Sequence, residues 1–576
     1  MGRRISFAWL IRNPLVFPLV SLGIVAAKVL WPVYLSSTSK LHLLWPGKQV
    51  ISGVLYVRGD LQSDFLASST VDSSYLISAK LISAILPHGR EQMLAAYASF
   101  ACLLSILVLW LSIIFLVKAW RILCRTNQLL SADALESVAP LVYVGLAFVL
   151  PAIYHNEIHG LWSIIHPARV AGWDFPLADA FNPSGVSFLL TLVALLIKVS
   201  GPEHRGLRLN PGDLTRAVVP LILIFIATIV HPVVPLFGVV AFMFFSLIVG
   251  SPSFLNLRYV KEAGLFALAW LVGALMVFLL FPQVGIDAND YFRIYVVNRH
   301  PHHYLPSHYI RIARVDVAVN FAVLGVLAIA STRCTKSRWS LKAFALCFAL
   351  LTAVHAAQYL FVEVSKSPVF ITLGISRVSG FYNFAYLLLL VTGVSIVGCR
   401  VKALLFRRTD GSGPDPISAP VPRSRALGFI VPGVLTCAIL AFSGVLLSKI
   451  YYNQVRLVTK QPEWIIRSKF DSLVAERDYQ VLSDFKLSNL REVGGLAVYS
   501  DKYFPFASRN VLEWERRRVL NRTFLQCFKR KKSIDVCATR LAGHGRLYLL
   551  TKTKASGKKP VFRVKTGKGV VYAYQV

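Results

Sequence analysis

The densest group of potentially reactive side chains lies at residues 298–309, which read Asn-Arg-His-Pro-His-His-Tyr-Leu-Pro-Ser-His-Tyr. Imidazole and guanidinium groups donate hydrogen bonds to phosphate and pyrophosphate oxygens, and two prolines stiffen this string. We therefore expect it to bind phosphate through Arg299, His300, His302, His303 and His308. A metal site formed by His302, His303 and His308 is the rival interpretation, and a purely structural loop is the third.

The next polar loop along the chain offers companions to this string. Lys366 and Arg377 could add positive charge around a shared cavity, and Glu363 could add a carboxylate. These three residues extend the predicted phosphate site without defining its chemistry.

Two carboxylates near the start of the chain are the candidates for catalysis. Residues 58–65 read Arg-Gly-Asp-Leu-Gln-Ser-Asp-Phe, so Asp60 and Asp64 fall on one side of a helical turn. One could act as a general base, or both could hold a divalent cation. Arg58 beside them is a further candidate for phosphate binding. The simpler interpretation is that the aspartates cap turns, where Asp is common.

A possible metal site comes from His155, Glu157 and His159. The two histidines are four residues apart, but the zinc-protease motif needs glutamate directly after the first histidine, and here it comes one residue later. A divalent metal ion is therefore left open as a cofactor, and interfacial helix ends are the commoner use of such residues.

The elements that position these groups are membrane helices. Hydrophobic residues make up 55% of the 576 and charged residues 16%. The apolar residues form long uninterrupted runs, which satisfy their backbone in a bilayer as helices. We predict an α-helical polytopic membrane protein with about eleven spans, at 14–34, 94–117, 136–154, 184–199, 217–231, 234–250, 263–282, 315–331, 343–362, 381–398 and 428–448.

Charge in the loops predicts the orientation. With the N-terminus inside, 22 lysines and arginines lie in the inner segments and seven in the short outer loops. This asymmetry follows the positive-inside rule, so the net charge of +34 needs no nucleic-acid partner. We predict a transmembrane bundle over 1–448, with a long first outer loop at 35–93.

The tail, 449–576, is predicted to be a small α/β domain on the outer side. Helical periodicity suits Glu463 to Arg477, and alternation suits strands around Leu547 to Leu550 and Gly569 to Tyr574. The tail carries 27 basic and 10 acidic residues, which indicates a solvated surface or docking on lipid phosphates or an anionic glycan. Cys527 and Cys537 fall here and could pair.

A long first outer loop with an early acidic residue, shorter outer loops and a polar outer C-terminal domain together resemble the GT-C glycosyltransferases. The Arg-His-Pro-His-His-Tyr-Leu-Pro string and the Phe-Pro-Phe…Glu-Trp pattern of the tail also resemble a bacterial multi-pass membrane family of unassigned function. The GT-C likeness covers most of the chain through its architecture, whereas neither Asp60 nor Asp64 is part of the Asp-Glu or Asp-Asp pair most often seen.

This resemblance implies an enzyme of the bacterial cytoplasmic membrane, with its N-terminus cytoplasmic and its tail outside. Such enzymes transfer a sugar from a polyprenyl-phosphate donor to a glycan, lipid or protein acceptor at the outer face. By this likeness Asp60 or Asp64 would be the catalytic base or would help to hold a metal. Arg299, His302 and His303 would neutralise the phosphate leaving group.

Three other functions stay open. A polysaccharide ligase or polymerase acting on undecaprenyl-diphosphate glycans would use the outer arginines and histidines without the aspartates. A non-catalytic assembly protein would present the basic tail to partners. A transporter is less favoured, because the predicted span interiors carry almost no charge apart from Lys28.

Overall fold

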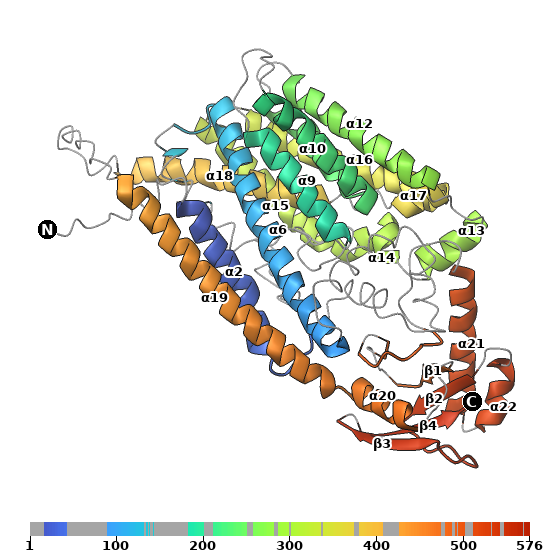
Figure 1. The fold of residues 1–576 in the computed structure, drawn as a ribbon. Coiled ribbons are helices and arrows are strands. Elements are labelled where there is room, and N and C mark those ends of the chain that lie inside the picture. Colours follow the sequence, from blue (N-terminus) through green and yellow to red (C-terminus); the bar gives the residue numbers. More distant parts are fainter. Residues whose placement is uncertain are drawn as a thin grey trace.

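The chain folds into a helical bundle that carries a small C-terminal sheet (Figure 1). The computed structural model describes residues 16–42, 89–131, 134–135, 138, 142, 183–200, 211–249, 257–280, 286–298, 301–335, 338–373, 380–406, 425–473, 479–485, 490–491, 493–500, 511–530, 533–541, 546–567 and 569–576.

Within these ranges the long helices of the bundle are α2 (Val16–Ser36), α6 (Arg90–Thr126), α9 (Pro183–Ser200), α10 (Pro211–Val230), α11 (Leu236–Val249), α12 (Leu257–Leu280), α15 (Pro306–Thr335), α16 (Trp339–Gln358), α18 (Gly380–Phe406) and α19 (Arg425–Thr459). Shorter elements near one end of the bundle are α13 (Ala288–Tyr291), η2 (Phe292–Val297), α14 (Pro301–Tyr304), η3 (Tyr359–Val364) and α17 (Pro368–Leu373).

Seven helices in the described ranges are long and apolar enough to cross a membrane. They coincide with the predicted spans at 14–34, 94–117, 263–282, 315–331, 343–362, 381–398 and 428–448. The spans predicted at 184–199, 217–231 and 234–250 fall on shorter apolar helices. The span predicted at 136–154 lies almost entirely outside the described residues. The prediction of an α-helical membrane protein is thus supported, and the count of eleven stays a prediction.

The helices of the bundle pack in three groups, and within each group the apolar faces of the helices are in contact. α2, α6 and α19 pack together, which brings the first and the last long helix of the bundle side by side (Figure 1). α9, α10, α11 and α12 form the second group, and α15, α16 and α18 the third. Phe384 of α18 joins all three, since its ring stacks on Phe115 at 5.0 Å and meets Phe237 at 5.5 Å. Stacked and edge-on aromatic pairs of this kind fix the relative positions of helices.

One face of α12 is a stripe of exposed leucines on the outside of the bundle. Leu268, Leu271, Leu275 and Leu279 are each more than half exposed. Leucines at this spacing form one stripe of the helix, and such an apolar stripe suits contact with lipid chains.

The tail folds around a four-stranded sheet with strand order β1-β2-β4-β3. Its strands are β1 (Tyr479–Ser483), β2 (Arg546–Thr551), β3 (Phe562–Thr566) and β4 (Gly569–Gln575), and its helices are α20 (Pro462–Leu473), α21 (Val511–Lys529) and α22 (Ile534–Ala538). β1 and β2 are parallel, and the other two pairs are antiparallel. The helix predicted at Glu463 to Arg477 corresponds to α20, and the two predicted strands correspond to β2 and β4.

Each face of this sheet has its own hydrophobic core. Ile466 and Phe470 of α20 pack against one face, where Phe470 contacts Tyr479, Tyr548 and Phe562. On the other face Phe524 and Phe528 of α21 pack with Tyr574. The tail is therefore a three-layer α/β/α unit, which is a finer arrangement than the small α/β domain predicted from the sequence.

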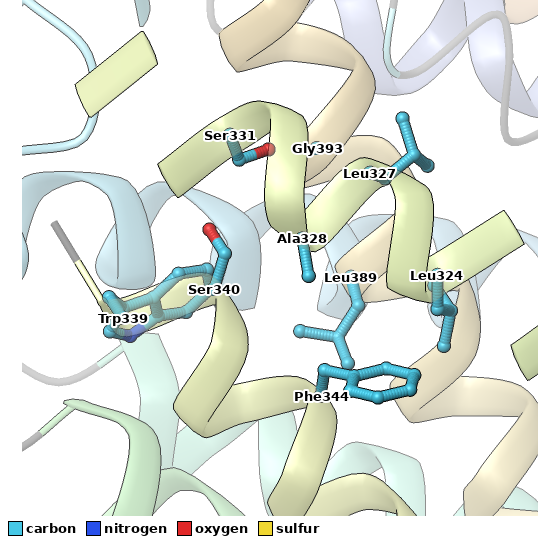
Figure 2. Close-up of a pocket in the computed structure, with 9 residues that line it drawn as sticks. All are labelled: Leu324, Leu327, Ala328, Ser331, Trp339, Ser340, Phe344, Leu389 and Gly393. Carbon is cyan, nitrogen blue, oxygen red and sulfur yellow. The ribbon is translucent and has the colours of Figure 1, made fainter. Parts of the chain in front are cut away.

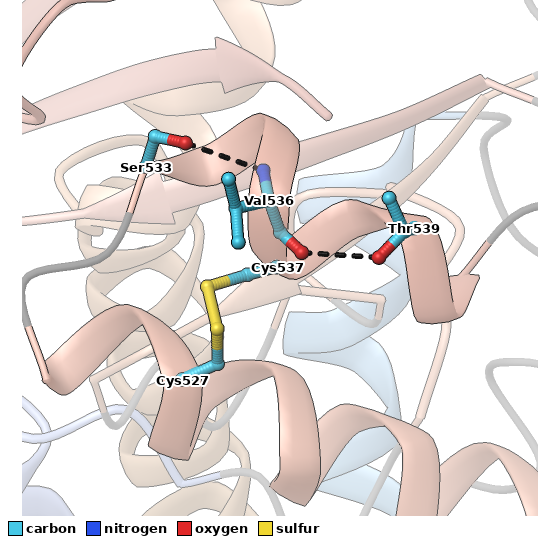
Figure 3. The surroundings of a disulfide bond; sticks show 5 residues. All are labelled: Cys527, Ser533, Val536, Cys537 and Thr539. Carbon is cyan, nitrogen blue, oxygen red and sulfur yellow. Dashed lines mark hydrogen bonds between the residues drawn. A yellow bond between two sulfur atoms is a disulfide. The ribbon is translucent and has the colours of Figure 1, made fainter.

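A disulfide joins two helices of the tail (Figure 3). Cys527 near the end of α21 is bonded to Cys537 of α22, and Ser533 caps α22 by accepting a hydrogen bond from the backbone N–H of Val536 at 3.2 Å. The sequence had left open whether these two cysteines pair, and the structure contains the bond. The six cysteines of the bundle are free.

The last span continues as a helix beyond the predicted domain boundary at residue 448. α19 runs on to Thr459, because its last turns find polar partners in place of lipid. Asn453 and Gln454 of these turns donate hydrogen bonds to the chain just after α2. The boundary at residue 448 was predicted from the end of the apolar run. Hydropathy alone does not reveal that the helix continues with polar residues beyond that point.

A crevice of about 260 Å³, partly open to the surface, lies between α15, α16 and α18 (Figure 2). Leu324, Trp339 and Leu389 line it together with the hydroxyls of Ser331 and Ser340. None of the predicted site residues lines this crevice, and its lining holds no ionisable group.

Candidate functional site

The segments carrying the histidine string and its predicted companions meet at one end of the bundle. They share a buried cluster, which we call the rim cluster, and part of it comes from the tail. Its members are Tyr291, Ile294, Tyr295, Val296, Tyr304, Val362, Ile371, Val511 and Trp514. Residues more than 200 positions apart in the sequence thus build one apolar floor at the end of the bundle that the loop charges predict to be outer.

Three tyrosines form the centre of the rim cluster. The rings of Tyr291 and Tyr295 are stacked with centroids 5.1 Å apart, and Tyr304 lies 5.5 Å from Tyr295. The hydroxyls of Tyr295 and Tyr304 are 3.4 Å apart. Asp287 starts this segment by capping α13, where its carboxylate accepts hydrogen bonds from the backbone N–H groups of Asn289 and Asp290. Such a cap fixes where the helix begins and so which side chains turn inward.

Two short π-helical turns contribute to this cluster. In η2 the backbone N–H of Asn298 donates to the carbonyl of Arg293 at 3.0 Å, and in η3 the N–H of Ser365 donates to Leu360 at 2.9 Å. Each wide turn holds one residue more than an α-helical turn, so the residues after it face a different direction. π-Helical turns are rare and occur frequently at functional sites.

The histidine string runs from η2 into the first turn of α15. His302 and His303 lie in the one-turn helix α14, and His308 is half-buried in the first turn of α15. The backbone on both sides of Leu305 is hydrogen-bonded to side chains at the end of α16 and in η3. Gln358 donates from Nε2 to the carbonyl of Tyr304 at 3.0 Å, and Glu363 accepts a hydrogen bond from the N–H of Ser307 at 2.9 Å. Arg299 and His300 lie outside the described residues.

Lys366 is held in a strained backbone conformation beside this string. Its φ is +51°, a left-handed conformation that costs a residue other than glycine about 1–2 kcal/mol. Its ammonium donates to Oδ1 of Asn289 at 3.1 Å and lies 5.7 Å from the centre of the Phe292 ring. Of the predicted companions, Glu363 thus reaches the histidine string, and Lys366 reaches the segment just before it. Arg377 lies outside the described residues.

The tail contacts the rim through the first turn of α21. Val511 and Trp514 are buried in the rim cluster, at 1% and 4% exposure. Behind Trp514 the helix carries a dense ion-pair network, in which Glu513 accepts from Arg516 and Arg517 at 2.7 Å each. The hydrogen bond from Arg516, followed by that from Arg517, lowers the pKa of Glu513 to about 2 against the effect of its partial burial. The docked end of α21 therefore keeps its charges paired over the whole neutral range.

Both ends of the first outer loop are anchored near the tail, although Arg58, Asp60 and Asp64 lie outside the described residues. At its start, the side chain of Gln454 in α19 donates to the carbonyls of Ser37 and Lys40 and accepts from the N–H of His42. At its end, the guanidinium of Arg90 donates to the carbonyl of Arg491 in the tail at 2.8 Å. These contacts hold residues 37–42 and the start of α6 at the same end of the bundle as the tail.

The metal site predicted from His155, Glu157 and His159 also lies outside the described residues. Among the residues that the structure does describe, no three His, Cys, Asp or Glu side chains gather closely enough to hold a metal ion.

Several residues of this region were not predicted from the sequence. The four-residue spacing of Tyr291 and Tyr295 could have indicated a shared helix face, whereas Trp514 stood out only as part of the Phe-Pro-Phe…Glu-Trp pattern of the tail. The role of Gln454 had no local signal, because its partners lie more than 400 residues away in the chain.

Comparisons of the chain with models of protein families, with curated proteins and with solved structures found no match.

Proposed function

We propose that this chain is a membrane glycosyltransferase that moves a sugar from a polyprenyl-phosphate donor to a glycan or lipid acceptor of the cell envelope, on the outer face of the bacterial cytoplasmic membrane. The observation that carries the proposal is the convergence at one end of the bundle. The histidine string, Lys366 and the docked tail meet there, and both ends of the loop holding Asp60 and Asp64 are anchored there.

The cysteines support the proposed orientation. Disulfides persist in oxidising compartments outside the cytoplasm, and the paired cysteines are those of the tail, whereas the six of the bundle are free. An extracytoplasmic tail places the rim outside as well, because Trp514 and Val511 pack into it. The excess of basic residues in the predicted inner loops favours the same orientation.

In the proposed reaction the carboxylate of Asp64 or Asp60 removes the proton of the acceptor hydroxyl. The acceptor oxygen forms a bond to the anomeric carbon of the sugar as the bond from that carbon to the phosphate oxygen breaks. The polyprenyl phosphate leaves with the electron pair of that bond. Arg299, His302 and His303 stabilise the negative charge that develops on the phosphate, where fixed donors contribute most.

The other predicted phosphate ligands assist from the edge of this site. Their group comprises Arg58, His300, His308, Lys366 and Arg377. Lys366 is the member whose placement argues most for such a role, because its ammonium is held in position at the expense of a strained backbone. Strain of this kind gathers at sites where a fixed side-chain position matters. A divalent metal ion, held by the loop-one aspartates or by His155, Glu157 and His159, is an optional addition to this scheme.

A polysaccharide ligase or polymerase that uses undecaprenyl-diphosphate glycans is the second candidate. The rim favours it to the extent that Lys366 and the histidine string form a basic site that does not require the loop-one aspartates. The two functions therefore differ in their dependence on Asp60 and Asp64.

The test is transfer of radiolabelled sugar by the purified protein in lipid nanodiscs, from a panel of polyprenyl-phosphate sugars to envelope extracts. Asp60→Asn and Asp64→Asn are compared with Asp535→Asn, a control carboxylate in the tail that pairs with Lys558. Loss of a general base lowers turnover by about 10²–10⁴-fold, so we expect one loop-one variant to lose activity and the control to keep it.

Lys366→Gly supplies a second variant for the same assay. Glycine accepts the left-handed backbone, so this variant should be at least as stable as the parent while the KM for the donor rises. Transfer from undecaprenyl-diphosphate glycans by a protein that is indifferent to both aspartate changes would establish the second candidate. Absence of transfer from every donor would reject both.

A further inference from the structure

The end of the chain carries an unbroken excess of positive charge. Residues 536–576 contain nine lysines and arginines and no aspartate or glutamate. Lysine on an exposed edge strand is a common protection against aggregation, but only Arg563 and Lys565 of these nine cations lie on the edge strand β3. The size of the excess calls for an explanation beyond protection of the edge.

The sheet places part of this charge on one uncovered surface. Phe562 and Val564 of β3 face α20 and belong to its core, so Arg563 and Lys565 point to the opposite face. On that face α21 and α22 cover β1, β2 and β4, but no residue of β3 is part of the core they make. Arg563 and Lys565 are accordingly exposed.

An aromatic ring lies beside these cations. Tyr572 of β4 is opposite Arg563 in the strand register, and Val570 is opposite Lys565. Tyr572 is half-buried, with one side packed near Tyr574. A flat ring next to two cations suits a sugar ring that bears a carboxylate, because the ring packs on the tyrosine while the charge meets the arginine or lysine.

The positive charge at this surface is not neutralised by the protein. Arg563, Lys565, Lys554 and Lys559 are exposed, and none of them makes an ion pair within the part of the chain that the structure describes. Of their neighbours, Lys558 pairs with Asp535. Unpaired cations on one surface produce a field that attracts polyanions from solution.

The position of the surface indicates which polyanion it meets. α20 follows α19 directly, and Arg563 and Lys565 lie on the face of the sheet opposite to α20. Figure 1 shows β3 at the edge of the tail, on the side of α20 away from the bundle. The strand that carries Arg563 and Lys565 therefore lies on the side of the tail away from the bundle.

We propose that the β3–β4 face, formed by Arg563, Lys565 and Tyr572 with the lysines of the loop between β2 and β3, binds an acidic polysaccharide. Successive exposed residues of β3 are about 7 Å apart, so the face offers a row of charges to a chain with repeated carboxylates. The proposal concerns binding alone and does not depend on the chain having transferase activity.

The test measures binding of fluorescent polygalacturonate oligomers to the full chain in zwitterionic nanodiscs, with neutral dextran as the uncharged probe. Arg563→Gln/Lys565→Gln is compared with Arg522→Gln/Arg530→Gln, which removes the same charge from exposed positions of α21 and the loop after it. We expect about a fivefold loss of affinity for the first pair and a loss of less than twofold for the second. Binding should also weaken as salt is raised.

Equal losses in the two double variants would overturn the proposal, because they would show attraction by net charge without a defined surface. Binding of dextran as tight as that of polygalacturonate would overturn it too. A third result would also overturn the proposal. In it, the wild-type chain binds phosphatidylglycerol vesicles but not polygalacturonate, and the Arg563→Gln/Lys565→Gln variant no longer binds the vesicles. Unchanged melting of the tail in both double variants confirms that folding is not the cause.

Discussion

At the scale of single residues, His42 is a neutral histidine built into the junction between α2 and α19. Its Nε2 lies 2.8 Å from the hydroxyl of Ser36, and its backbone N–H donates to Gln454 at 2.7 Å. Burial, together with the charge of Lys40, lowers the pKa of its imidazole from 6.5 to about 4. Protonating this ring in the folded state would place a charge where water cannot solvate it.

The anchor at His42 should therefore weaken in acid. The unfolded chain takes up the proton below pH 6.5 and the folded chain only below about 4, so stability is constant above 6.5 and falls between 6.5 and 4. The full effect is on the order of 3 kcal/mol. Hydrogen exchange of residues 37–42, followed in nanodiscs from pH 7.5 to 4, measures this loss of stability. His42→Gln should remove the pH dependence, and its persistence in that variant would assign the effect to another group.

At the scale of elements, the start of α6 and the middle of α20 both meet the tail at Gly495. Arg467 of α20 donates to the carbonyls of Gly494 and Gly495 at 2.9 and 3.0 Å, and Arg90 of α6 donates to Arg491 close by. Gly495 has a φ of +61°, and a Cβ there would overlap the guanidinium groups of Arg467 and Arg90. A glycine is required at this position for two independent reasons.

Gly495→Ala should loosen this junction, and Gly557→Ala is the matched control. Gly557 also has a positive φ, of +76°, but its Cβ would meet open space. Both variants carry the backbone cost of about 1–2 kcal/mol, and only Gly495→Ala adds an overlap worth about 1–3 kcal/mol more. Denaturant unfolding of the tail, followed by tryptophan fluorescence, compares them. Equal destabilisation would show that the two arginines move aside freely.

The long apolar helices and the strands β2 and β4 were predicted from the sequence because their signals are local, whereas β1, β3 and α21 were not predicted. The long apolar runs around Leu104 and Leu271 identify helices without knowledge of their neighbours, and alternation around Leu549 identifies β2. The rim was not predictable in the same way. No local pattern indicates that Trp514 packs beside Tyr295, or that Lys366 adopts a left-handed backbone. The functional roles of the histidine string and of the loop-one aspartates stay predictions.

At the scale of the whole molecule, the cysteines offer a direct test of orientation. An exported tail should contain the Cys527–Cys537 disulfide, while the other six thiols stay reduced. Maleimide labelling of denatured protein, trapped with acid directly from cells, should therefore count six thiols without reductant and all eight with it. Eight thiols without reductant would place the tail in a reducing compartment and reject the proposed topology.

The contacts that join the tail to the bundle also determine when, during synthesis of the chain, this junction can form. His42 is hydrogen-bonded to Gln454, and Arg90 to Arg491. Each early segment therefore has a partner that is synthesised about 400 residues later. While the ribosome is still translating the middle of the chain, the first outer loop has neither of these anchors. Both contacts can form only after α19 and the segment around Arg491 have been synthesised. The junction between the bundle and the tail is therefore completed late, when most of the chain has already been made.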